Sequence, residues 1–336
     1  MTWNKNSGYG QMLAMQIAAS VGPNFGQVLV VLEDSDNSDL QTILPEIFDV
    51  DGLGRVRFFR TLEAAYSAAT SNNNDVILLS AHTTHAVAAG IAWSKSRIHV
   101  IGMDGGDRLV QQGSKVELSG AVNSAYVIKV TGVRNSFRNV KFIQSSTHAN
   151  ALHVLEEGGE GNLYKNCSFV FGVADNLDLT TAHEVVAGSD SATYDKCLFG
   201  CDTLLTSANR SVFHIDQVTT SQEFKSNILR ECIFMISSSE TLATFVRLDA
   251  VGDILFTNIF DRCVFIASVD SAGGVALAEA SQTGTSTVKG VLVYAYPAAF
   301  NVTDFSTATS GRNAATQIVA PVPTAGTAGI GVAPTA

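Results

Sequence analysis

The chain has 336 residues, 46% of them hydrophobic and only 15% charged, which provides enough apolar sequence for a large core in one or two domains. Lys and Arg number 21 against 31 Asp and Glu, a formal net charge of −10, and no basic cluster interleaves with aromatics. We therefore expect no nucleic-acid partner. The sequence has no apolar run near the roughly 20 residues that cross a bilayer, so we expect no membrane partner.

Residues 1–60 are predicted to form an N-terminal docking or cap region. "MLAMQIAASVG" (12–22) faintly resembles a secretory signal, but Gln16 interrupts it, so a short helix or docking segment is favoured. The elements expected next are a strand in "QVLVVLE" (27–33), a helix or turn in "DLQTILPEIF" (39–48) and the short apolar "GRVRFF" (54–59).

"TLEAAYSAATSNNND" (61–75) predicts a helix that ends at the three asparagines Asn72 to Asn74. Its apolar residues fall on one face: Leu62, Ala65, Tyr66 and Ala69. A helix here is expected to cover the open first coil of the array that follows, where strand edges and core would otherwise be exposed.

One phrase then repeats five times. The copies are "SFRNVKF" (136–142), "NLYKNCSFVFG" (162–172), "TYDKCLF" (193–199), "ILRECIF" (228–234) and "IFDRCVF" (259–265). Each reads as an apolar residue, two polar residues, Cys or Val, any residue, then Phe. Successive phenylalanines are 27 to 35 residues apart, a period that indicates a stacked array.

Two columns of this repeat are predicted to form a structural ladder. The fourth position holds Val140, Cys167, Cys197, Cys232 and Cys263, and the last holds Phe142, Phe169, Phe199, Phe234 and Phe265. Residues two apart on an extended strand point to the same side, so the phrase predicts a parallel β-helix with equivalent residues stacked about 4.8 Å apart. Phenylalanines would stack inside it and cysteines would fill the remaining space, which favours packing over metal or redox roles.

Other strands extend the same pattern to about eight coils between residues 75 and 300. They include "DVILLSA" (75–81), "RIHVIGM" (97–103), "YVIKVTG" (126–132) and, as the expected last strand, "VKGVLVYAY" (288–296). We divide the chain into the region 1–60, a β-helix with its leading cap helix (61–300) and an extended arm (301–336).

The two polar columns of the phrase are expected to form a solvated corner with charges of alternating sign. They are Arg138, Lys165, Asp195, Arg230 and Asp261, and Asn139, Asn166, Lys196, Glu231 and Arg262. Opposite charges on neighbouring strands stabilise a pairing by roughly 0.2–1 kcal/mol each.

Residues 316–336 carry no charge and hold three of the six prolines, so they cannot build a core alone. Their apolar residues favour an arm that lies on a partner subunit over a free tail: Ile318, Val319, Val322, Ile330 and Val332.

We expect no catalytic residue, no cofactor and no metal site. The acidic groups in "EEGGE" (156–160), "DNLD" (175–178) and Asp195 with Asp202 are interpreted as solvated turn or ladder residues. "HTTH" (82–85) places two histidines three apart without a third ligand nearby.

"TLEAAYSAATSNNNDVILLSA" resembles the helix-then-strand entry of pectin-lyase-like right-handed β-helix proteins, and "NVKF", "NCSF" and "KCLF" resemble their coil consensus. The resemblance covers roughly residues 60–300. It implies a right-handed parallel β-helix. With the regions at the two ends, we expect an all-β fold, a right-handed parallel β-helix with a small N-terminal α/β cap and an extended C-terminal arm. The fold hosts many functions, so it implies no activity.

A narrower resemblance covers residues 26–81. "GQVLVVLEDSD" and "DVDGLGRVRFFRTLEAAYSAATSNNNDVILLSA" look like β-helix structural proteins of tailed bacteriophages, although "SAHTTHAV" replaces the more usual Pro-Gly turn. This implies a non-enzymatic homotrimer made in the host cytoplasm that decorates the capsid, with the major capsid protein or another virion protein as partner. The alternatives are a tail spike that binds or cleaves surface polysaccharide, and a secreted lyase.

Overall fold

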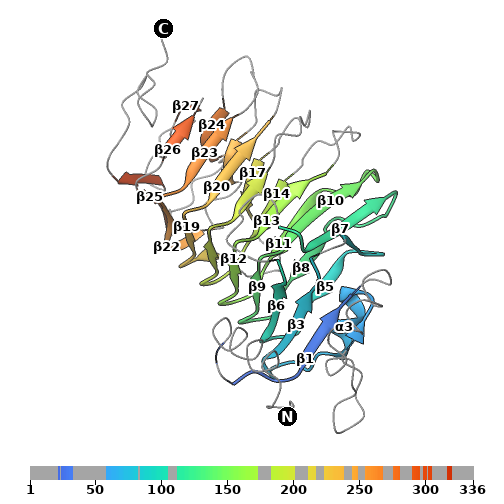
Figure 1. The fold of residues 1–336 in the computed structure, drawn as a ribbon. Coiled ribbons are helices and arrows are strands. Elements are labelled where there is room, and N and C mark those ends of the chain that lie inside the picture. Colours follow the sequence, from blue (N-terminus) through green and yellow to red (C-terminus); the bar gives the residue numbers. More distant parts are fainter. Residues whose placement is uncertain are drawn as a thin grey trace.

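The chain is a right-handed parallel β-helix in which each coil gives one strand to each of three sheets (Figure 1). The structure is a computed structural model. The residues that it describes are 22, 24–32, 58–81, 84–104, 112–172, 183–200, 211–216, 223–237, 244–248, 254–267, 275–280, 290–295, 298–300, 302–304 and 316–319.

Sheet A is 12-stranded and runs the length of the stack, with its strands paired in parallel. Its order is β2 (Phe58–Phe59), β1 (Val28–Val31), β3 (Asp75–Leu79), β6 (Ile98–Gly102), β9 (Ser136–Arg138), β12 (Leu163–Lys165), β15 (Thr193–Asp195), β19 (Ile228–Arg230), β22 (Ile254–Asp261), β25 (Gly290–Ala295) and β28 (Thr316–Val319), with β18 (Phe224–Lys225) beside β22.

Sheets B and C have eight strands each, which confirms the expected eight coils. Sheet B comprises β4 (Thr84–Ala86), β7 (Lys115–Gly120), β10 (Lys141–Ser146), β13 (Ser168–Phe171), β16 (Leu198–Gly200), β20 (Ile233–Ile236), β23 (Val264–Ala267) and β26 (Ala298–Phe300). Sheet C comprises β5 (Ile91–Trp93), β8 (Ile128–Val130), β11 (His153–Glu157), β14 (His183–Ala187), β17 (Ser211–Ile215), β21 (Thr244–Leu248), β24 (Val275–Ala280) and β27 (Val302–Asp304).

The repeated phrase spans two strands, and the corner expected at its polar columns lies between them. Its first residues lie in sheet A and its last in sheet B, and the residue between them has a left-handed backbone. These corner residues are Asn139 (φ 57°), Asn166 (φ 51°), Lys196 (φ 54°), Glu231 (φ 53°) and Arg262 (φ 52°). A single left-handed residue turns the chain from one sheet into the next, and the Cys that follows still points into the core.

Helix α3 (Leu62–Ala68) lies beside β1 at the N-terminal end of the stack (Figure 1). The Thr61 hydroxyl accepts a hydrogen bond from the Ala64 N–H at 3.2 Å, which caps the helix. It ends earlier than predicted, before the turn at Asn72 and Asn74, both of which have positive φ. Leu62 and Ala65 belong to the main core, so the helix covers the first coil as predicted.

The sequence predicts the last strand at residues 288–296, which contain β25. Strands continue beyond it, so that expectation is wrong. β28 pairs with β25 in parallel, with Leu292 opposite Thr316, because backbone N–H and C=O groups at the open sheet edge gain partners there. Ile318 and Val319 lie in β28, so this part of the predicted arm extends the solenoid, whereas Val322, Ile330 and Val332 lie outside the described residues.

At the other end, β1 lies within the strand expected at 27–33. Residues 39–48 and all of 12–22 except its last residue lie outside the described part of the chain. The division of the chain at residues 60 and 300 stays a prediction.

Candidate functional site

The five phenylalanines predicted to form a ladder are stacked inside the solenoid and fully buried. Ring centroids of successive pairs are 5.6, 5.5, 4.9 and 4.8 Å apart, in the order Phe142, Phe169, Phe199, Phe234 and Phe265. A second ladder lies in the first column of the phrase, where Phe137, Tyr164 and Tyr194 stack at 5.2 and 5.0 Å. Aromatic pairs contribute roughly 0.5–1.5 kcal/mol beyond their buried area.

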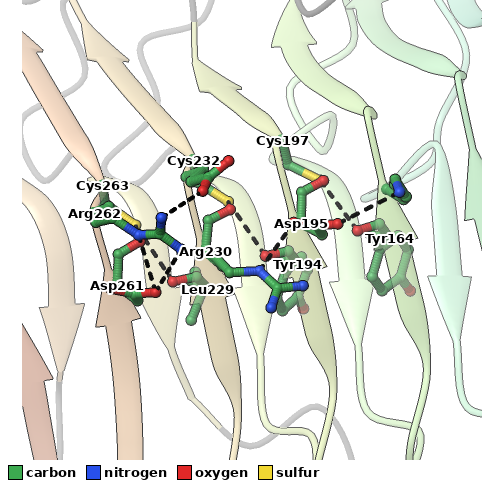
Figure 2. Close-up of polar contacts among 12 residues, drawn as sticks. Tyr164, Tyr194, Asp195, Cys197, Leu229, Arg230, Cys232, Asp261, Arg262 and Cys263 are labelled. Atoms are coloured by element: carbon green, nitrogen blue, oxygen red, sulfur yellow. Dashed lines mark hydrogen bonds and ion pairs between the residues drawn. The ribbon is translucent and has the colours of Figure 1, made fainter. Parts of the chain in front are cut away.

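The column of Val140 and four cysteines is equally buried, and its thiols donate to backbone carbonyls of the coil before. Cys197 Sγ lies 3.5 Å from the Tyr164 oxygen and Cys232 Sγ lies 3.4 Å from the Tyr194 oxygen (Figure 2). Burial raises the pKa of Cys167 to about 12 and the pKa values of Cys197 and Cys263 well above the ordinary value. Buried neutral thiols are poor nucleophiles and poor metal ligands. Cys167, Cys197 and Cys263 therefore pack the core. At Cys232, which is equally buried, burial raises the pKa, but hydrogen bonds from the thiols of Cys197 and Cys263 lower it by more, so its net shift is downward.

The charged columns lie along the corner between sheets A and B. Figure 2 shows Asp195, Arg230, Asp261 and Arg262 from these columns. The Asp195 carboxylate lies 3.8 Å from Lys165 Nζ in the coil before and 3.2 Å from Arg230 Nε in the coil after. In the second column, Arg262 Nη1 lies 2.9 Å from Glu231 Oε1. The predicted alternation of charge is therefore present at these pairs.

A column of asparagines at the corner between sheets C and A was not predicted. The Asn162 side chain accepts from the Asn135 N–H at 2.7 Å and donates to the Gly132 oxygen at 2.9 Å. Asn258 repeats the contact by accepting from the Asn227 N–H at 3.0 Å. All four side chains are buried. The signal was an Asn two residues before the first column of the phrase, in four of its five copies: Asn135, Asn162, Asn227 and Asn258.

Glu157 corrects the expectation that "EEGGE" is a solvated turn. Its carboxylate is fully buried and accepts from the Tyr164 hydroxyl, from Asn162 Nδ2 at 2.9 Å and from the Gly159 N–H at 2.7 Å. Burial raises the pKa of Glu157 to about 7, and these hydrogen bonds oppose that rise. Glu156 faces outward and pairs with Lys129 at 2.8 Å. The remaining predicted acids, Asp175, Asp178 and Asp202, lie outside the described residues.

His85 and His99 are two of the histidines that make polar contacts. Within "HTTH", His85 is buried and its Nε2 lies 3.0 Å from the Ser80 oxygen, whereas His82 lies outside the described residues. His99 Nδ1 lies 2.8 Å from Ser136 Oγ, and burial together with Arg138 lowers the pKa of His99 to about 4. His99 is therefore neutral at pH 7.

Within the part of the chain that the structure describes, no group of three or more His, Cys, Asp or Glu is arranged to hold a metal ion. The same residues include no helix long and apolar enough to span a membrane.

Comparison with known proteins supports the fold. No family model matches the chain, and no curated protein matches it. A crystal structure of a pectin methylesterase mutant in complex with a hexasaccharide matches with a TM-score of 0.50 and 11% sequence identity, over 83% of this chain and 80% of that one. The likeness shows a parallel β-helix fold.

The expectation that the chain is not an enzyme is corrected by this comparison. The solved protein with the same fold is itself an enzyme, so a β-helix without a recognisable sequence motif gives no ground for excluding catalysis. At 11% identity, however, the likeness carries the fold and not the activity.

Proposed function

We propose that the chain is a structural protein of a tailed-bacteriophage virion, a homotrimer that decorates the capsid and projects its β-helix outward. Its partners would be the major capsid protein or another virion protein, met after synthesis in the host cytoplasm. The sequence resemblance of residues 26–81 to phage β-helix structural proteins motivates this proposal.

The observation that carries it is the continuous set of ladders through the solenoid. Phenylalanine and cysteine columns pass through successive coils, and asparagines occupy four of the five equivalent positions of a further column. Stacked coils of this kind protect their strand edges and resist unfolding, which suits a part that is exposed on a particle. Trimeric placement would link neighbouring capsid subunits, so that several weak contacts act together.

Immunogold electron microscopy of phage particles, with antibody to this chain, tests the location. Gold over heads supports capsid decoration. Gold on no particle rules out the virion proposal.

The second candidate is a tail spike that binds or cleaves a surface polysaccharide. It is favoured by the structural likeness to a protein solved with a bound hexasaccharide. The chain has only two Trp, Trp3 and Trp93, and Trp93 is buried, so sugar stacking on tryptophan is poorly supplied. Gold at tail tips, followed by release of reducing sugar from host polysaccharide, would support this candidate over the first.

A further inference from the structure

The outer face of sheet A carries two parallel rows of side chains across four successive strands, β12, β15, β19 and β22. Strand register places the rows side by side. The apolar row consists of Leu163, Thr193, Ile228 and Ile259, and the charged row consists of Lys165, Asp195, Arg230 and Asp261. The residue between the two rows on each strand points inward and is fully buried.

Within the apolar row, Leu163, Thr193 and Ile259 are partly buried and Ile228 is exposed. Ile228 is 40% exposed, and nearby Phe256 is 61% exposed. Phe256 lies where β22 runs past β18 and β19, and it has a left-handed backbone with φ 56°. That conformation costs an ordinary residue about 1–2 kcal/mol. An aromatic side chain held outward in a strained position on an apolar face is typical of a docking surface.

The order of charges identifies what docks there. From β12 to β22 the row reads plus, minus, plus, minus; Arg138 continues the row on β9, and the uncharged Ala295 holds the same position on β25. Read in reverse it becomes minus, plus, minus, plus, so the row is complementary to an inverted copy of itself. A two-fold axis parallel to the strands would set Lys165 against Asp261 of a second copy, and Asp195 against Arg230. The same axis lays the apolar row on the apolar row. A two-fold axis along the solenoid would instead lay charges on apolar side chains.

We propose that this face of sheet A binds a second copy of the chain in an antiparallel, two-fold arrangement. The contact goes beyond the virion proposal. A two-fold contact pairs two chains only, so it lies outside a cyclic trimer and would join two chains in solution or one trimer to another. The patch spans only four strands, so the association is expected to be weak and dependent on concentration.

The test is sedimentation velocity over a range of protein concentrations. The unmodified chain should double its mass as concentration rises, to twice the 35.5 kDa of one chain or from three chains to six. Lys165→Glu or Asp261→Lys alone should each lower the association constant about tenfold, because the two-fold axis turns two attractive pairs into two repulsive ones. Phe256→Ser should lower it as well.

The double swap Lys165→Glu with Asp261→Lys is the decisive variant. It restores opposite charges across an antiparallel contact, so association should return to that of the unmodified chain. Lys141→Glu on the outer face of sheet B is the matched charge reversal and should leave the mass unchanged, and thermal melts check that each variant is folded. A mass that never doubles, or a double variant no better than the single ones, overturns the proposal.

Discussion

At the residue scale, the most unusual group is Glu157, a carboxylate without exposed surface in the core of the solenoid. Its hydrogen bonds come from Tyr164, Asn162 and the Gly159 N–H, all of which are neutral donors. Burial penalises the charged form, and the pKa of Glu157 is accordingly raised from 4.5 to about 7. The group makes the fold sensitive to pH.

Stability is expected to fall as pH rises from about 4.5 to 7. In that window the folded chain holds a proton on Glu157 that the unfolded chain has released, so raising the pH favours unfolding. The shift corresponds to about 3 kcal/mol. Glu157→Gln should remove this part of the pH dependence, as measured by urea unfolding at pH 5 and pH 8. If the free energy of unfolding changed equally with pH in the variant and in the unmodified chain, this role of Glu157 would be contradicted.

Lys196→Asn is expected to stabilise the chain by about 0.5–1 kcal/mol, because asparagine tolerates the left-handed corner better than lysine does. Asn166 occupies the equivalent corner one coil earlier. Thermal unfolding measures the effect. Lys165→Asn, in the neighbouring strand, is the control and should give no stabilisation; a gain there equal to that of Lys196→Asn would show that charge, not backbone conformation, is responsible.

At the element scale, the asparagine column ties one coil to the next through backbone groups. Asn162→Ala is expected to cost about 2–4 kcal/mol, because the Asn135 N–H, the Gly132 oxygen and Glu157 each lose a buried partner. Asn150→Ala is the matched control, since its side chain bonds Asn123 at the exposed surface. Urea unfolding should separate the two, and equal losses would contradict the ladder role.

Cys232→Ala tests the packing role of the cysteine column. Removing the buried sulfur should lower the free energy of unfolding by about 1 kcal/mol and leave the fold and any binding to virions unchanged. Denaturant unfolding measures the free energy change, and a binding assay with phage heads measures the interaction with virions. A folded variant that no longer binds would show that this column does more than pack.

The ladders differ in how visible they are in the sequence. The phenylalanine column was predictable because Phe199 and its equivalents stack on copies of themselves, so the repeat shows both partners. The Asn162 side chain forms hydrogen bonds with the backbone N–H of Asn135 and the backbone oxygen of Gly132. Nearly every residue has such backbone groups, so the sequence carries no pattern that identifies these partners. The corners were predicted from their polar columns, but their left-handed backbone was not, because Lys196, Glu231 and Arg262 lack the usual Gly or Asn of such a position. Glu157 was misjudged because two glycines after it resemble a solvated turn.

At the scale of the whole molecule, the solenoid has two ends that need cover. Helix α3 covers the first coil, and β28 adds to sheet A at the far end. Deleting residues 320–336 is expected to leave the β-sheet circular-dichroism signal and the melting temperature unchanged while weakening assembly or docking. Deleting 316–336 should also lower the melting temperature, because β25 loses one of its two partner strands. Equal melting temperatures for the two deletions would contradict a structural role for β28.

The proposed role on the capsid is tested most directly by adding the purified chain to phage heads that lack it. The account predicts that the chain cosediments with the heads and raises the temperature at which they release DNA. Heads that neither bind the chain nor gain stability would contradict the proposed function.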